Sequence, residues 1–194
     1  MLLENQIVKD IKFANLSYGT PEVYLGDIKL TCPQSAVYNY ANAFKSVVFI
    51  AGRGAGKSFI ARQFLESAVP NGQRVVSCLF SNFVPDYMRN LNRNYKNYKY
   101  CTPNNYNIIT RSLGKDCVLH LDEIFNGELG YLEYIWAYER FFVETTPMHF
   151  KNNSVFRWFN SLVGRKDTLT VIADTHTNSV NITSLAQQYS TGLI

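Results

Sequence analysis

Four short apolar runs are spaced along the chain, and each has the length of a strand buried on both faces. Between the first two runs, residues 58–69 place Phe59, Ile60, Phe64 and Leu65 on one side of a helix. The order of strand, glycine-rich turn, helix and strand is typical of a βαβ unit, which predicts a parallel sheet. The four runs are residues 46–50, 74–80, 117–121 and 169–173.

The remaining segments are less periodic, so turn residues and spacing guide their interpretation. Pro70-Asn71-Gly72 ends the first helix, and Gly164 ends a later one. Residues 92–106 are rich in Asn, Tyr and Lys, which favours a loop. We further expect short strands at 23–25 and 28–30, a helix over 84–91, a strand over 107–111 in a hairpin with 117–121, and helices over 129–142 and 155–163.

Composition narrows the class of protein. A chain of 194 residues fits a single domain, and a net charge of +4 is compatible with a polyanionic partner without requiring one. Its four cysteines form no CxxC pair, so we expect free, buried thiols in a reducing compartment. With no signal peptide and no apolar run of membrane-spanning length, the chain is expected to be soluble, cytoplasmic and without membrane contact.

A phosphate-binding loop follows the first strand. Its glycines let several backbone N–H groups converge on phosphate oxygens, and the helix that begins near Lys57 points its positive end at the anion. Lys57 is predicted to reach the β- and γ-phosphates of ATP, and the Ser58 hydroxyl is a predicted Mg²⁺ ligand. The loop consists of Ala51, Gly52, Arg53, Gly54, Ala55, Gly56, Lys57 and Ser58.

Two acidic residues follow the apolar run 117–121. An acidic pair at the carboxyl end of a sheet strand lies where such sheets bind ligands. We expect Asp122 to hold Mg²⁺, directly or through water, and Glu123 to orient or deprotonate the attacking water. A second polar cluster follows the last strand, where Thr175 or Thr177 could sense the γ-phosphate; ordinary turn chemistry is the alternative.

In these motifs the chain resembles the ATPase domain of viral large terminases, the DNA-packaging motors. The resemblance rests on the arginine-containing loop "GRGAGKS", the Asp-Glu pair, the polar strand tip, and the upstream segment Cys32-Pro33-Gln34. That segment is similar to the family's adenine-contacting motif, which implies such a role for Gln34. The tip departs from the family's Ser/Thr-Ala/Gly-Thr pattern, so the coupling residue stays open among Thr175, Thr177 and Asn178.

The resemblance implies an α/β P-loop NTPase of the additional-strand, catalytic-glutamate type, with a mainly parallel central sheet flanked by helices. Residues 1–45 form the N-terminal segment with the adenine-contacting region, and residues 46–180 form the P-loop core of one ATPase domain. No nuclease domain follows, so we expect an isolated or truncated ATPase domain, or the compact packaging ATPase of small tailed phages. The implied activity is ATP hydrolysis that moves double-stranded viral DNA into a procapsid in the host cytoplasm.

Such motors are homo-oligomeric rings at a portal, in which an arginine completes the site of a neighbouring subunit. Arg165 is the first choice for that role, before Arg140 and Arg157, while Arg53 is a candidate within its own subunit. Contact with the DNA backbone is a candidate role for a basic and aromatic segment, although for any individual residue a solvated loop or a nucleotide lid is the favoured interpretation. That segment contains Arg89, Arg93, Tyr95, Lys96, Tyr98, Lys99 and Tyr100.

Two alternative functions follow from the same motifs. A helicase or replication-initiator ATPase shares the loop and the acidic pair. A small-molecule kinase shares the loop, but Glu123 favours hydrolysis over phosphate transfer to a second substrate.

Overall fold

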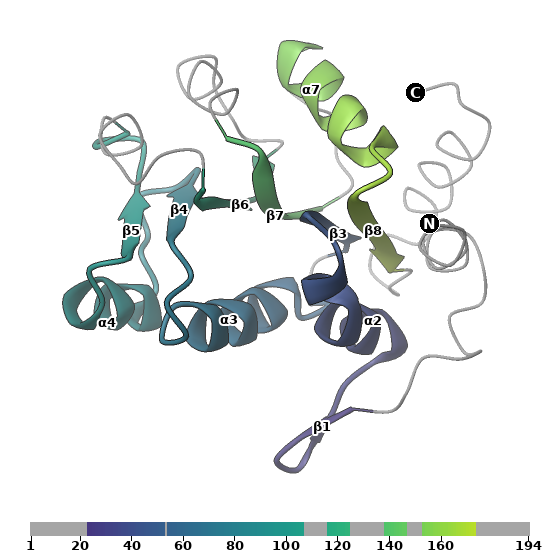
Figure 1. The fold of residues 1–194 in the computed structure, drawn as a ribbon, viewed down its shortest axis with the longest axis horizontal. Coiled ribbons are helices and arrows are strands. Elements are labelled where there is room, and N and C mark those ends of the chain that lie inside the picture. Colours follow the sequence, from purple (N-terminus) through teal and green to yellow (C-terminus); the bar gives the residue numbers. More distant parts are fainter. Residues whose placement is uncertain (1–22, 53, 107–115, 125–137, 147–152, 174–194) are drawn as a thin grey trace.

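The computed structural model describes residues 23–52, 54–106, 116–124, 138–146 and 153–173. At its centre lies a parallel sheet with the strand order β5-β4-β6-β7-β3-β8 (Figure 1). The chain is therefore an α/β protein, as the βαβ pattern predicted. The strands are β3 (Ser46–Ala51), β4 (Val75–Leu79), β5 (Tyr98–Cys101), β6 (Val118–Asp122), β7 (Arg140–Thr145) and β8 (Thr168–Ala173).

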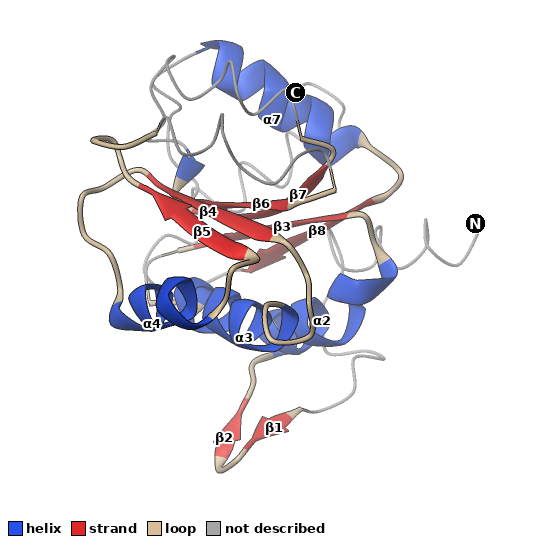
Figure 2. Ribbon diagram, turned by 60° about the vertical axis from the view of Figure 1, so that its left-hand side comes forward, coloured by secondary structure: helices blue, strands red, loops and turns tan. Residues whose placement is uncertain are grey.

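Helices cover both faces of the sheet (Figure 2). On one face lie α2 (Cys32–Tyr40), α3 (Lys57–Ala68) and α4 (Asp86–Asn94), and on the other lies α7 (Asn153–Gly164). A hydrophobic core fills each space between helices and sheet. A one-turn helix η1 (Ala41–Ala43) follows α2, and a small hairpin, β1 (Tyr24–Leu25) and β2 (Ile28–Lys29), extends away from the sheet.

The four apolar runs all form sheet strands, because each supplies side chains to both cores. In β3, Val47 and Phe49 belong to the core under α2 and α3, whereas Val48 and Ile50 face α7. The predicted helices over 58–69 and 155–163 correspond to α3 and α7, and the two short strands expected at 23–25 and 28–30 are confirmed as β1 and β2. Three cysteines, Cys78, Cys101 and Cys117, are buried free thiols, as expected.

The helix predicted over 129–142 is wrong at its carboxyl end, where β7 begins at Arg140. The side chains there alternate with the period of a strand. Phe142 stacks on Phe64 of α3 with ring centroids 4.5 Å apart, whereas Phe141 meets Trp158 of α7 on the other face at 5.1 Å. Residues 129–137 lie outside the described part of the chain.

The loop predicted over 92–106 is also wrong in part. Helix α4 continues to Asn94, and β5 then forms the edge of the sheet beside β4. Tyr98 and Cys101 are fully buried in β5, so Tyr98 is part of the core and not a loop residue. Residues 107–111, expected to pair with 117–121, lie outside the described part, and both neighbours of β6 are parallel strands.

Helix α2 was not predicted, although its start has a clear signal. The Thr31 hydroxyl accepts a hydrogen bond from the backbone N–H of Gln34, and the Gln34 side chain accepts one from the Thr31 N–H. This reciprocal capping box, with Pro33 in the first turn, satisfies N–H groups that the helix itself leaves unpaired. The same cap fixes where the Gln34 side chain points.

The packing of β7 predicts a large loss of stability on replacement of Phe142 by Ala. Phe142 is only 1% exposed and lies between the sheet and α3, so the change should lower the free energy of unfolding by about 3–5 kcal/mol. Chemical denaturation measures the difference. Phe83→Ala is the matched control, because Phe83 is 73% exposed and its loss should change stability by less than about 0.5 kcal/mol. Equal effects of the two changes would contradict this packing.

Candidate phosphate and cation site

The predicted phosphate loop joins the carboxyl end of β3 to the start of α3. Gly54 and Gly56 have φ values of 78° and 74°, a region that residues with a Cβ rarely adopt. Gly56 also precedes the first turn of α3, and a Cβ there would collide with the Nε2 atom of Gln34. Both glycines are therefore needed for the backbone to turn sharply into the helix.

The ammonium group of Lys57 lies where three segments meet. Its Nζ donates to the carbonyl oxygens of Ala51 and Gly52 at 3.0 and 3.2 Å, and to the Thr146 hydroxyl at 3.3 Å. Glu123 Oε1 lies 3.5 Å from the same Nζ. Since Lys57 is only 7% exposed, its charge depends on these oxygens in place of water.

The acidic pair lies at the carboxyl end of β6, close to Lys57. Asp122 is the last residue of the strand, and Glu123 takes a left-handed backbone conformation with φ 57°. This turn directs the Glu123 N–H to the carbonyl of Glu144, at 2.9 Å, and brings the Glu123 carboxylate toward Lys57. A non-glycine residue held at positive φ is a mark of functional sites, since the strain must be compensated by surrounding contacts.

Burial and neighbouring charge change the acidity of Asp122. Burial raises the pKa of this carboxyl to about 7, and the charge of Glu144 acts in the same direction. Electrostatic interactions with His120 and Lys57 lower the pKa and only partly compensate. A carboxylate in this condition gains from a nearby cation, so Asp122 could hold a hard metal ion.

Thr146, just beyond β7, is a site residue that the sequence interpretation missed. Its backbone N–H and its hydroxyl both donate to the Glu123 carboxylate, at 2.9 and 2.8 Å. The polar sequence Glu144-Thr145-Thr146 after the apolar residues of β7 was an available signal, because parallel strands end at one edge of a sheet. This signal was missed because a helix was expected over 129–142, where β7 in fact begins.

Gln34 reaches the phosphate loop from α2. Its Nε2 donates to the carbonyl of Ala55 at 3.0 Å, while its Oε1 is held by the Thr31 N–H at 2.9 Å. The structure thus brings this predicted residue to the site as a support of the loop. Ser58, the second residue of α3, is exposed.

The arginine candidates lie elsewhere. Arg165 precedes β8, at the edge of the sheet where the strands begin, and the phosphate loop lies at the opposite edge, roughly 20 Å away for strands of this length. Its guanidinium forms a two-pronged ion pair with Asp167, at 2.9 and 3.0 Å, which lowers the pKa of that carboxyl. Arg140 begins β7 at the same edge, and Arg157 is exposed on α7. Outside the described residues lie Arg53, Thr175, Thr177 and Asn178.

The basic and aromatic segment divides into exposed and buried parts. Arg89, Arg93 and Lys96 are exposed, whereas Tyr98 is fully buried and donates to the Ser77 hydroxyl at 2.8 Å, which rules it out for nucleic-acid contact. Tyr95, Lys99 and Tyr100 are half-buried.

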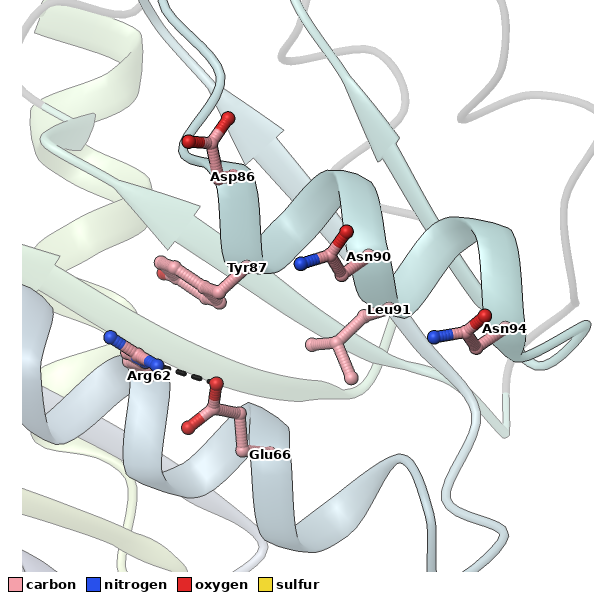
Figure 3. A pocket seen from close by; sticks show the side chains of 7 residues that line it. All are labelled: Arg62, Glu66, Asp86, Tyr87, Asn90, Leu91 and Asn94. Atoms are coloured by element: carbon pink, nitrogen blue, oxygen red, sulfur yellow. Dashed lines mark hydrogen bonds and ion pairs between the residues drawn. The ribbon is translucent and has the colours of Figure 1, made fainter.

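A groove of about 340 Å³ separates α4 from α3 beside this segment (Figure 3). The Tyr87 ring points from α4 toward Arg62, whose guanidinium lies 5.4 Å from the ring centroid. Arg62 also pairs with Glu66, at 2.9 Å, and Asp86 lies at the upper end of the groove. The groove is therefore lined by both signs of charge.

No protein-family model matches the chain, and no match was found among curated proteins. Among the described residues, no helix is long and apolar enough to cross a membrane.

The raised pKa of Asp122 predicts a pH dependence of stability in the absence of divalent cations. Between about pH 4 and pH 7 the folded chain holds a proton at Asp122 that the unfolded chain has released, so the free energy of unfolding should fall as the pH rises. Urea denaturation of the wild type and of Asp122→Asn across this range isolates the contribution of this group. The variant should lose this part of the slope, and identical slopes would contradict the assignment.

Proposed function

We propose that this chain binds ATP with Mg²⁺ at the carboxyl ends of the sheet strands and hydrolyses the ATP. The convergence of Lys57, Glu123 and Thr146 carries the proposal, since three segments distant in sequence bring an ammonium, a carboxylate and a hydroxyl together. The donor set fits a magnesium triphosphate: a buried lysine beside a glycine turn for the anion, and Asp122 with the Ser58 hydroxyl for the cation.

The strand order supports the additional-strand type of P-loop enzyme. Strand β7 lies between β3, which leads into the glycine turn, and β6, which ends in Asp122-Glu123. Because β7 lies between these two strands, the residue after its carboxyl end, Thr146, can contact both Lys57 and Glu123. In the proposal, Thr146 replaces Thr175 and Thr177 as the first candidate for sensing the γ-phosphate.

Each side chain has a role that its contacts suggest. Phosphate oxygens would replace the carbonyls of Ala51 and Gly52 as acceptors for Lys57, at the positive end of α3. Mg²⁺ would neutralise charge on the phosphates. A phosphate that competes for Lys57 and for the Thr146 hydroxyl would release Glu123, whose carboxylate could then take a proton from the attacking water.

The motif resemblance extends the proposal to a DNA-packaging motor. In this proposal a homo-oligomeric ring, docked at the portal of a procapsid in the host cytoplasm, translocates double-stranded DNA. The exposed cations Arg89, Arg93 and Lys96 are the candidates for backbone contacts. Arg165 could serve a neighbouring subunit only after its ion pair with Asp167 opens.

ATPase rates with and without blunt duplex DNA test this function. Glu123→Gln should reduce kcat at least about 100-fold while nucleotide still binds, because the amide cannot accept the proton of water. Glu66→Gln is the matched control, since Glu66 pairs with Arg62 on α3, away from Lys57. Normal turnover by Glu123→Gln would remove the catalytic assignment. A wild type that DNA does not stimulate would count against the motor, and unwinding of forked DNA would favour a helicase.

A pair of substitutions at Thr146 tests the proposed sensor. Thr146→Ser keeps the hydroxyl and should hold kcat within about threefold, whereas Thr146→Val keeps the shape and should lower kcat at least about tenfold. Steady-state kinetics with separate values of kcat and KM make the comparison. Equal rates for the two variants would show that the hydroxyl has no part in turnover.

A further inference from the structure

A series of hydrogen bonds links buried side chains of adjacent strands in the sheet. The Tyr98 hydroxyl donates to Ser77 Oγ at 2.8 Å, Ser77 Oγ lies 2.9 Å from His120 Nδ1, and His120 Nε2 lies 3.0 Å from Glu144 Oε1. These residues belong to four adjacent strands, β5, β4, β6 and β7. All four side chains are no more than 1% exposed, so water does not share in the network.

The direction of these hydrogen bonds assigns the proton on His120. Since Ser77 accepts from Tyr98, its own hydroxyl proton is available for His120 Nδ1. The ring proton then sits on Nε2 and is donated to Glu144. In this arrangement a single ring proton on Nε2 satisfies every hydrogen bond from Tyr98 to Glu144.

The other oxygen of this carboxylate is unsatisfied. Glu144 Oε2 is buried and has no hydrogen-bond partner within the described residues. A glutamine here could accept the same hydrogen bond from His120, and burying a carboxylate costs free energy that burying an amide does not. The network alone therefore does not explain why position 144 carries an acid.

The position of Glu144 relative to Asp122 supplies an explanation. The two Cα atoms are register partners on adjacent parallel strands, so both side chains leave the same face of the sheet. Neighbouring strands lie about 4.8 Å apart, which places the two carboxyl groups side by side. Lys57, the cation at this edge, already binds the carbonyls of Ala51 and Gly52.

Resting on the proposed Mg²⁺ site, we infer that Glu144 provides a second negative charge behind Asp122, which strengthens cation binding without ligating the ion. His120 holds Glu144 in place through Oε1, while Oε2 has no hydrogen-bond partner within the described residues, and the charge of Glu144 acts on Asp122. At strand spacing, and with the effective dielectric constant typical of protein sites, one unit charge changes the affinity for a divalent ion at least about tenfold.

Binding of Mn²⁺ to the full chain in the presence of ADP, followed by the electron paramagnetic resonance of free Mn²⁺, tests this inference. Glu144→Gln should weaken Mn²⁺ binding at least about tenfold and leave metal-free ADP binding in EDTA unchanged. Glu144→Asp keeps the charge and should stay within about threefold of the wild type. Ser77→Ala is the control, since it breaks the chain one link away and preserves the charge, so its Mn²⁺ affinity should stay within about twofold.

A wild-type Mn²⁺ affinity in Glu144→Gln would overturn the inference. An Mn²⁺ affinity that falls as much in Ser77→Ala as in Glu144→Gln would also overturn it, because the hydrogen-bond network would then be purely structural. If Glu144→Gln does not fold, Glu144→Met removes the charge at similar volume and is judged by the same comparison. A failure of the proposed function is distinguishable, because a wild type that binds no ADP in EDTA and no Mn²⁺ with ADP would lack the nucleotide site altogether.

Discussion

The site depends on the interactions between the buried ammonium group of Lys57 and the oxygen atoms around it. A charge with so little access to water is stable only where several oxygens replace its hydration. The chain supplies them from three places: carbonyls of the glycine turn, the Glu123 carboxylate beyond β6, and the Thr146 hydroxyl beyond β7. Loss of any one segment would leave the charge undersatisfied, so the lysine ties the turn and two strand tips into one unit.

This arrangement follows from the order of the strands. Because β7 lies between β3 and β6, its tip is the only described strand end that can contact the lysine and the glutamate at once. The aromatic pairs of Phe142 with Phe64 and of Phe141 with Trp158 hold β7 between α3 and α7. Beneath the tips, the hydrogen-bonded chain from Tyr98 to Glu144 joins four strands, so the polar layer and both apolar cores position the same edge.

Much of the fold could be predicted from the sequence, because runs such as Val47–Ile50 and the stripe of α3 have periods that burial alone explains. Lys57 was predicted from the glycine-rich loop that follows a strand, and Asp122 and Glu123 from their place at the end of another strand. Thr146 was missed because Phe141 and Phe142 fit a helical stripe as well as a strand, and only pairing with β3 and β6 decides between them. Tyr98 was misread for a similar reason, since a tyrosine among lysines and asparagines looks exposed until an edge strand buries it. The roles of Gln34 and Glu144 depend on contacts between distant segments, which periodicity does not contain.

The proposed function requires that the cluster of Lys57, Glu123 and Thr146 opens to take a magnesium nucleoside triphosphate. Isothermal titration of the wild type, Lys57→Ala and Lys45→Ala with a non-hydrolysable ATP analogue and Mg²⁺ tests it most directly. Lys45 is a suitable control, because it pairs with Glu139 at the opposite edge of the sheet. We expect saturable binding by the wild type and by Lys45→Ala. Lys57→Ala should lose at least about 2 kcal/mol of binding free energy, because its charge-assisted hydrogen bonds to phosphate would be gone. Equal affinities for all three proteins, or no binding by the wild type, would contradict it.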